Sequence, residues 1–311
     1  YGTRFDSDQQ FIPGPCPFPA CTLNTRNTRT NIHFYGTYRF GASATVLLGA
    51  SHERIRDVGL RLDIVNPKIG LMWSPVRSFV ARFATFQSVR PALMADQSLE
   101  PAQILGQGQV YNDVVSTIAQ VRSLAIDYLP TPLAHAGVEV THRKLRDPYE
   151  KQSATTYFSR PTEDRLTVHG RMGFGRGVSI GLEWTEERYR RPPADADLNF
   201  TARELRSRLV PLDARWFIGN GVVLGATVTR VRQEITSDYL NPGQAPTSEF
   251  TLVDASIGYR LPARAGFISL DVRNAFDRRF EYQDVNFLSA VPLVPRFLPA
   301  RSVFARLVLF L

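Results

Sequence analysis

The dominant feature of the sequence is an alternation of apolar and polar positions with a period of two. In the stretch 165–174 every even position is apolar or glycine, whereas positions 165, 167, 169 and 171 are polar. The stretch 178–185 alternates in the same way, and Gly175-Arg176-Gly177 joins the two as a tight-turn signal. Side chains of a β-strand point to opposite faces in turn, so the pattern predicts paired strands.

The same alternation recurs along the chain, and the connections between the predicted strands differ in length. Further alternating stretches are 134–141, 210–218, 253–259 and 268–273. Short connections fall at Gly41, 74–76, 130–132, 175–177, 219–221 and 262–266, and long ones at 88–116, 146–162, 190–202, 235–249 and 274–299. Short and long connections follow each other in turn, as expected for outer-membrane barrels with short periplasmic turns and long outer loops.

These patterns predict an all-β fold, a transmembrane antiparallel up-and-down β-barrel of about 14 strands that is complete in itself or part of a larger barrel. About 13 of the strands lie between Asn31 and Leu311, and either residues before Asn31 supply one more strand or the missing strands lie upstream of this chain. Residues 1–30 are expected to form an N-terminal extension and residues 31–311 the barrel. If the tight turns are periplasmic, the last strand, Ala300 to Leu311, ends on the periplasmic side.

Composition agrees with this fold and leaves one alternative open. No stretch approaches the roughly 18 uninterrupted apolar residues that a spanning helix needs. Strands of membrane barrels alternate lipid-facing and lumen-facing residues, which keeps the mean hydropathy low. The value of −0.17 fits a barrel and also a soluble all-β binding protein.

The net charge of +8 raises the question of an anionic partner. The arginines are spread along the chain, often beside Asp or Glu, and no basic helix or aromatic RNA-binding pattern occurs, so nucleic acid is not expected as a partner. A solvated surface of mixed charge and an arginine-rich lumen that favours anions both remain open.

Two cysteines, Cys16 and Cys21, lie in a proline-rich stretch. Their closeness suggests a small disulfide and an oxidising compartment. Zinc is not expected there, because only His33 lies nearby as a further ligand. The chain begins with Tyr and shows no signal peptide, which indicates a processed chain or a piece of a longer one.

The C-terminal stretch resembles the closing strands of TonB-dependent outer-membrane receptors. The residues that carry the likeness are Leu270-Asp271-Val272-Arg273-Asn274-Ala275-Phe276-Asp277 followed by Phe280, and Pro299-Ala300-Arg301 followed by Val303, Leu307 and Leu309. Ala300 stands where the family has Gly, and Phe310-Leu311 where it ends in Phe. The resemblance implies the bacterial outer membrane, with its lipid and the barrel-assembly machinery as partners.

A second, narrower resemblance runs from Asn66 to the C-terminus. It rests on residues 67–73, 97–103, 138–143 and 250–255, which look like a group of TonB-receptor-like barrels, many with tetratricopeptide repeats upstream. This resemblance implies a periplasmic partner or an upstream domain. No plug domain and no TonB-box segment occurs in this sequence.

Two sets of residues are candidates for the lumen wall and for the membrane interfaces. Charged residues at the positions expected to face the lumen are Arg61, Asp63, Arg165, Arg171, Glu183, Glu187, Asp213, Arg215, Asp254, Asp271 and Arg273. Such charges either pair across strands or form a selective path for ions or substrate. Aromatic residues near strand ends, which are typical of interface girdles, include Trp73, Trp184, Trp216 and Tyr259.

Neither catalysis nor a metal or other cofactor is expected. His135, His142 and His169 fall on different predicted strands or strand ends, and no acidic or thiol partner has metal-ligand spacing. No Gly-flanked serine suggests a hydrolase.

The function that these features favour is transport or binding of a solute or polymer through a polar lumen. The connection 88–116 is expected to fold into the lumen and narrow it, and 274–299 is a second ligand-facing candidate. Two alternatives stay open: an export or anchoring barrel that works with a periplasmic helical-repeat region, and a structural barrel with a blocked lumen.

Overall fold

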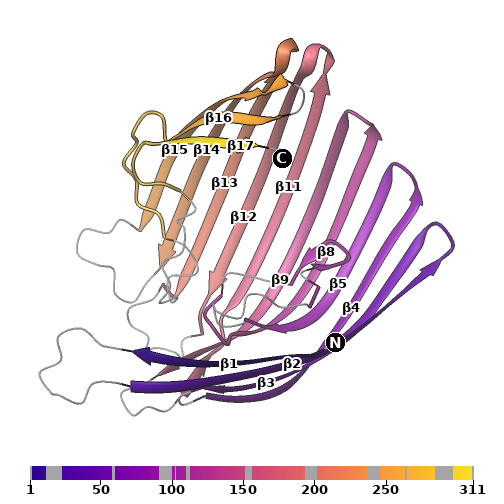
Figure 1. Ribbon diagram of the computed structural model, residues 1–311, viewed down its shortest axis with the longest axis vertical. Coiled ribbons are helices and arrows are strands. Elements are labelled where there is room, and N and C mark those ends of the chain that lie inside the picture. Colours follow the sequence, from indigo (N-terminus) through magenta and orange to yellow (C-terminus); the bar gives the residue numbers. More distant parts are fainter. Residues whose placement is uncertain are drawn as a thin grey trace, which may run out of the picture. The chain divides into compact units, whose positions relative to one another are not determined.

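The computed structural model of the chain, drawn in Figure 1, describes most of its length. The described residues are 2–11, 23–57, 60–90, 100–101, 103–109, 113–150, 156–192, 202–236, 246–262, 265–283 and 297–309. None of them forms a helix long and apolar enough to cross a bilayer.

The described residues are dominated by β-strands. Their bounds are β1 Gly2–Phe11, β2 Leu23–Phe40, β3 Ala44–Asp57, β4 Leu60–Val76, β5 Phe79–Val89, β6 Gln103–Ile104, β7 Gln107–Gly108, β8 Ile118–Thr131, β9 Ala134–Glu150, β10 Thr156–Ser159, β11 Thr162–Phe174, β12 Val178–Arg190, β13 Glu204–Phe217, β14 Val222–Thr236, β15 Thr247–Arg260, β16 Gly266–Arg273 and β17 Ser302–Leu309. Two three-residue 3-10 turns, Gly175–Gly177 and Gly219–Gly221, lie between strands.

The strands follow one another in a single meander, as the alternation predicts. Within the described ranges, fourteen strands are hydrogen-bonded neighbours in the order β1-β2-β3-β4-β5-β8-β9-β11-β12-β13-β14-β15-β16-β17, with β10 beside β9. The all-β fold and the strand number expected from the sequence are confirmed. The further strand comes from residues before Asn31, since Gly2–Phe11 pairs with Leu23–Ile32. This part of the chain is rich in Asn, Thr and Arg, so it shows no apolar alternation.

The connections alternate in length as predicted, with one exception. We refer to the strand ends joined by the short connections as the turn end, and to the opposite ends as the loop end. At the turn end, Arg176 and Asn220 have φ values of 67° and 75°, and Gly177 and Gly221 follow with 78° and 91°. A Cβ atom at position 177 would lie 2.3 Å from the carbonyl oxygen of Phe217, so this turn requires glycine. The exception is at the loop end, where only residues 58–59 separate β3 from β4.

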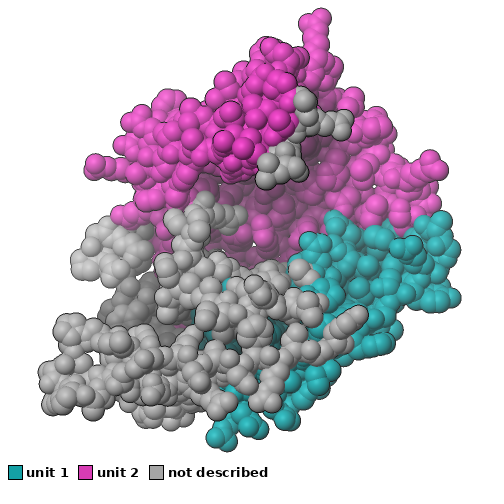
Figure 2. All heavy atoms as spheres, in the orientation of Figure 1, with its two compact units in different colours: residues 1–73, 82–123, 143–161 teal, residues 74–81, 124–142, 162–311 magenta. Residues whose placement is uncertain are grey.

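The chain divides into two compact units, which Figure 2 shows in different colours. Unit 1 comprises residues 1–73, 82–123 and 143–161 and contains β1 to β3 and most of β4. Unit 2 comprises residues 74–81, 124–142 and 162–311 and contains β11 to β17.

In soluble proteins the apolar side chains of a strand are usually buried and the polar ones exposed. In both units of this chain many apolar side chains are exposed and many polar ones are buried. On β12 and β13 the exposed positions include Leu182 and Leu212, whereas Thr185 and Ser207 are buried. On β2 the side chain of Phe34 is 75% exposed and its neighbour His33 is buried. We refer to the face with the buried polar groups as the inner face and to the other as the outer face. Large apolar groups stay exposed on the outer face because lipid, not water, is the solvent that suits them.

The outer face of unit 2 carries an apolar belt about 20 Å long. Trp216 pairs with Val178 at the turn end, and Trp184 lies six positions further along β12 (178 to 184), about 20 Å at ~3.3 Å per residue. Tyr259 pairs with Val222, also at the turn end. Trp73 lies at the turn end of the strand pair β3–β4 in unit 1. In unit 2 the predicted aromatic residues therefore fall at the two limits of the belt, and their place at a membrane interface stays a prediction.

Beyond the belt, toward the loop end, the outer face of unit 2 becomes charged. Arg206 and Arg208 contact Glu186 at 2.7 and 2.8 Å, and Arg230 contacts Glu249 at 2.6 Å. These strands therefore extend past the apolar belt into a polar layer, which the sequence pattern by itself does not mark.

We expect an arginine to be tolerated on the inner face but not in the belt, and neighbouring residues of β14 allow a matched test. Ala226→Arg places the charge in the apolar belt and should lower the free energy of unfolding by about 2–4 kcal/mol. Thr227→Arg places it on the inner face and should change this free energy much less. Urea titration of the protein folded into lipid vesicles measures both, and equal losses would contradict the assignment of the faces.

Candidate functional site

The inner face of unit 2 is a wall of charged and small residues aligned by strand register. Arg171, Gly181 and Asp213 stand opposite one another on β11, β12 and β13. Thr227 and Asp254 continue the row on β14 and β15. The register therefore gathers residues from five strands into one line across the sheet.

Ion pairs connect many of the charges on this wall. Arg165 lies 3.4 Å from Glu187, and Arg273 lies 3.1 Å from Asp254. The predicted wall residues Glu183 and Asp271 accept hydrogen bonds from the hydroxyls of Thr185 and Ser269, at 3.0 and 3.1 Å. Pairing of this kind holds the side chains in place, as expected for charges on neighbouring strands.

One pair reaches across an intervening strand. The Arg171 guanidinium donates to the Asp213 carboxylate at 2.8 Å, although β12 lies between their strands. Gly181 makes this possible, because a Cβ atom there would lie 2.4 Å from Asp213 Oδ1 and 2.9 Å from Arg171 Nη2. A glycine at this row position therefore opens the path along which the two charges meet.

A cavity of about 310 Å³ opens on the inner face over β13 to β17. Five charged residues line it: Arg215, Asp254, Asp271, Arg273 and Arg306. Four of these are predicted wall residues, and Arg306 is an addition that the sequence reasoning missed. It alternates with apolar residues of β17 and could have been found from that pattern.

Arginine predominates among the charged residues of this cavity. Arg273 is held by Asp254. Arg215 and Arg306 contact no carboxylate within the described ranges of the chain. With three arginines against two aspartates, the charged lining of the cavity has a net positive charge, which favours an anionic group there.

Two of the predicted wall residues, Arg61 and Asp63, lie on the outer face of β4. They share that face with Val65, Ile69 and Leu71, whereas Leu62 and Ile64 pack inward against a buried apolar cluster. The Asp63 carboxylate contacts Arg54 at 2.8 Å, also on the outer face. Beyond the belt the apolar positions thus turn inward and the charged ones outward, so these two residues are separate from the wall.

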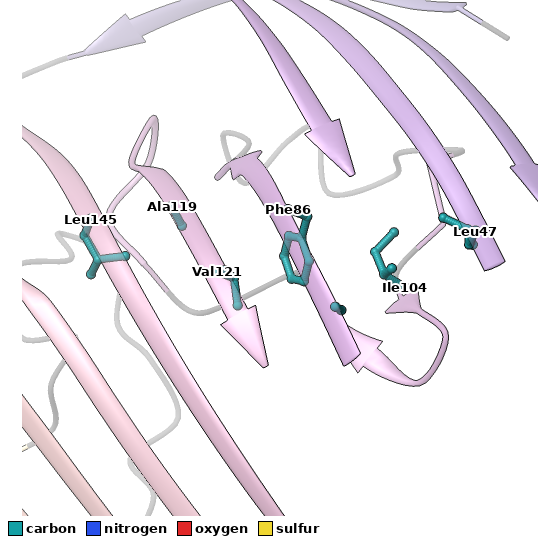
Figure 3. Packing of buried hydrophobic residues seen from close by; sticks show 7 residues of the cluster. Leu47, Phe86, Ile104, Ala119, Val121 and Leu145 are labelled. Atoms are coloured by element: carbon teal, nitrogen blue, oxygen red, sulfur yellow. The ribbon is translucent and has the colours of Figure 1, made fainter. Parts of the chain in front are cut away.

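In unit 1, part of the long connection 88–116 folds back onto the inner face. The short strands β6 and β7 place Ile104, which is fully buried, against β3, β5, β8 and β9. Figure 3 shows six members of this apolar cluster, namely Leu47, Phe86, Ile104, Ala119, Val121 and Leu145. A Cβ atom at Gly70 would lie 2.7 Å from Ile104, so glycine in β4 leaves the room that the folded segment needs.

A buried polar network holds this infolded segment. The Lys68 ammonium, 2% exposed, contacts Glu100 and donates to Gln109 Oε1 at 2.5 Å. Tyr35 donates to Glu100 at 2.6 Å, and Asn31 donates to it at 3.2 Å. The segment is therefore fixed to β2 and β4 by charge-assisted hydrogen bonds, which are stronger than neutral ones.

Glu100 remains ionised in this network. Burial alone would raise its pKa, but the Lys68 ammonium and hydrogen bonds from Lys68, Tyr35 and Ser51 outweigh burial and lower the pKa below its ordinary value of 4.5. The network thus depends on the charge of Glu100.

A second connection, the first part of 274–299, also folds back, in unit 2. Asn274 and Asp277 have φ values of 49° and 53°, a conformation that Asn and Asp tolerate better than most residues. The backbone N–H of Asn274 donates to Asp254 at 2.8 Å, and that of Arg301 donates to Asp277 at 2.8 Å. The Asn-Ala-Phe-Asp sequence behind the family resemblance is therefore a turn that fixes the entrance to β17.

Aromatic residues pack behind this turn. Phe280 stacks on Phe250 with ring centroids 4.4 Å apart, and Phe297 and Tyr282 contact Phe250 edge-on. Because Phe250 lies on the inner face of β15, the described part of this connection covers that face near the loop end.

The structure brings together two of the three histidines considered in the sequence. His135 and His169 lie on the inner face of unit 2, with Asp127 of β8 between them. The sequence shows no acidic partner at metal-ligand spacing from these histidines. Asp127 contacts both of them through strand register, which spacing along the chain does not reveal. His142 lies apart from them and contacts Asp164 at 2.7 Å.

Cys16 and Cys21, the predicted disulfide, lie outside the described residues, as does Leu311. Their pairing stays a prediction.

Removing the Lys68 charge should destabilise unit 1 strongly. In Lys68→Met, Glu100 remains buried without its counter-charge, and the free energy of unfolding should fall by about 3–5 kcal/mol. Adding Glu100→Gln to Lys68→Met should recover part of this loss. Urea unfolding in vesicles measures both, and an equal loss in single and double variants would contradict the buried ion pair.

The lowered pKa of Glu100 predicts a loss of stability in acid. Because the folded-state pKa lies below the unfolded-state value near 4.5, the contribution of Glu100 is complete above that pH and disappears as the pH falls through the folded-state pKa. The difference in unfolding free energy between wild type and Glu100→Gln should therefore shrink below pH 4.5. A difference that does not change with pH would contradict the assignment.

No protein-family model matches the sequence, and no curated protein matches it either. Solved structures do match the fold. The FrpB iron transporter from Neisseria meningitidis has a TM-score of 0.63 at 13% identity, over 92% of this chain and 46% of that chain.

Two further solved structures also match in fold at low sequence identity. The ferric citrate transporter FecA matches with a TM-score of 0.60 at 13% identity, over 99% of this chain and 50% of that chain. The ferric-catecholate import receptor Fiu from E. coli K12 gives 0.56 at 11%, over 96% and 47%. The chain spans about half the length of these structures. It has the fold of a TonB-dependent-receptor-like outer-membrane β-barrel.

Proposed function

We propose that this chain is the barrel, or part of the barrel, of an outer-membrane transport protein, which passes or binds a solute through a polar lumen. The observation that carries the proposal is the reversed distribution of side chains, with exposed apolar groups on the outer face and charged residues on the inner one. A soluble all-β protein has no reason to expose Phe34, Leu182 and Leu212 to water.

The cavity over β13 to β17 supports an anionic solute or an anionic group on a larger one. Three arginines and two aspartates line it, so its charged groups sum to a net positive charge, and Arg215 and Arg306 are in contact with no described carboxylate. The infolded residues 100–101 and 103–109 support a restricted passage, because they occupy space on the inner face of unit 1.

The setting follows from the same features. The exposed apolar groups of the outer face suit lipid as their surroundings, so we place the protein in the bacterial outer membrane, with lipid around the belt. Insertion there would require the barrel-assembly machinery, and a periplasmic partner or an upstream domain would complete the transporter. The matched structures named above are transporters and a receptor, and the role proposed here involves no covalent chemistry.

Reconstitution of the purified chain tests the proposal. The folded protein should require detergent, should migrate differently on a gel before and after heating, and should conduct ions in a planar bilayer with a preference for chloride. A folded barrel without conductance would instead favour a structural role with a blocked lumen.

Charge reversal in the cavity tests the anion preference. Arg215→Glu and Arg306→Glu should each shift the zero-current potential in a KCl gradient toward cation selectivity, because each replaces a positive charge of the cavity by a negative one. The matched control is Arg122→Glu, at an exposed position on the outer face of β8, which should leave selectivity unchanged. The same shift in control and test variants would contradict a selective role for the cavity.

A further inference from the structure

Three potential metal ligands meet on the inner face of unit 2, near the turn end. Asp127 lies on β8 three residues before Pro130, His135 lies on β9 three residues after Pro132, and His169 lies on β11. One ligand atom from each lies within 4.8 Å of the others. The His135 Nε2 atom is 3.2 Å from Asp127 Oδ1, and the His169 Nε2 atom is 3.8 Å from it.

Glycine creates the space in which these groups converge. Gly137 lies on the inner face of β9, the strand between β8 and β11. A Cβ atom at this position would lie 2.7 Å from His169 Cε1 and 2.8 Å from both His169 Nε2 and Asp127 Oδ1. Any larger residue would therefore separate the ligands, so the opening at Gly137 is a second observation that points to the same place.

We propose that Asp127, His135 and His169 bind a divalent transition-metal ion of the zinc class. Zinc bonds to imidazole nitrogen and carboxylate oxygen are about 2.0–2.2 Å, which puts neighbouring ligand atoms of a tetrahedral site about 3.3 Å apart. The distance of 3.2 Å between His135 and Asp127 already fits. Rotation of the His169 ring closes the remaining gap, and the imidazole rings are near enough, with centroids 4.9 Å apart.

The ligand chemistry selects the ion class. Two imidazoles with one carboxylate suit zinc and its first-row neighbours, whereas calcium and magnesium prefer oxygen ligands alone. Three protein ligands leave a fourth position open, as in sites where the ion exchanges a bound water for another ligand. Both histidines are partly exposed on the inner face, with side-chain exposures of 41% and 29%, so the ion can enter from the lumen.

The plain alternative is a structural hydrogen bond between His135 and Asp127. That bond explains the position of His135. It does not explain why the His169 ring approaches the same oxygen of Asp127 across β9, where Gly137 leaves the space open. His142–Asp164 is the simple pair for comparison, because it has one histidine and one carboxylate. The role of the site as a metal station in a transport path rests on the proposed function, whereas binding itself does not.

Metal titration of the refolded full chain in detergent micelles, after removal of bound metal with a chelator, tests the proposal. One Co²⁺ per chain should give a visible absorption spectrum, and Zn²⁺ should displace it. His135→Ala, His169→Ala and Asp127→Asn should each raise the dissociation constant by at least the 10- to 100-fold typical for loss of a group that supports a metal site.

Two further variants make the test specific. His142→Ala removes a histidine from the same strand as His135 but not from the site, and should bind metal as the wild type does. Gly137→Ala retains every ligand and should still weaken binding about tenfold, since its methyl group crowds His169 and Asp127. Heat-dependent gel mobility confirms that each variant is folded.

The outcomes are distinct. Absence of a Co²⁺ spectrum in folded wild-type protein, or equal affinity in wild type and His169→Ala, would overturn the metal site. If the site is correct and lies in a conducting lumen, Zn²⁺ should reduce the current in wild type and not in His169→Ala. Metal binding without any conductance would preserve the site and refute the proposed transport function.

Discussion

The demand that every backbone N–H and C=O group be paired where no water is present governs this structure. In hydrocarbon each unpaired group costs several kcal/mol, so a membrane sheet must pair each strand with its neighbours over its whole length. From β2 to β16 the order of the described strands meets this demand, because each strand on this path has a hydrogen-bonded neighbour on both sides, and the long antiparallel registers follow from it. Apolar side chains then lie on the outer face, in contact with lipid, and the inner face carries charged residues, glycines and small polar residues.

The sequence predicted the strands well because pairing of this kind requires a period of two in the side chains. The tight turns at Asn220-Gly221 and Arg176-Gly177 were also predicted from the sequence. Their backbone has positive φ angles, which glycine adopts readily and which its presence therefore indicates. The strands at Gly2–Phe11 and Leu23–Phe40 were only partly recognised, because the sequence near the N-terminus is rich in Asn, Thr and Arg and shows no apolar alternation. Where a strand has no contact with lipid, apolar residues are not required at alternate positions. The sequence then gives no sign of the strand pairing.

The alternation in the sequence shows which residues share one face of a strand. It does not show whether the apolar or the polar residues are on the inner face. Within the belt the apolar set faces outward, and the wall residues of unit 2 were placed on that basis. Past the belt, Leu62 and Ile64 pack inward while Arg61 and Asp63 face outward. Contacts between distant residues were beyond sequence reasoning for another reason. Lys68 meets Glu100 only because a connection folds back, and this depends on space left by a glycine elsewhere.

The ion pair that crosses β12 has a consequence for how the strands select their alignment. A slip of one residue would turn every side chain to the wrong face, so alternation alone forbids it. A slip of two residues leaves all faces correct and is invisible to that rule. Such a slip of β12 would move Gly181 by about 6.6 Å and insert a side chain between Arg171 and Asp213. Gly181 therefore disfavours register shifts by two residues. Such shifts keep the apolar side chains on the lipid-facing side, so contact with lipid does not select against them.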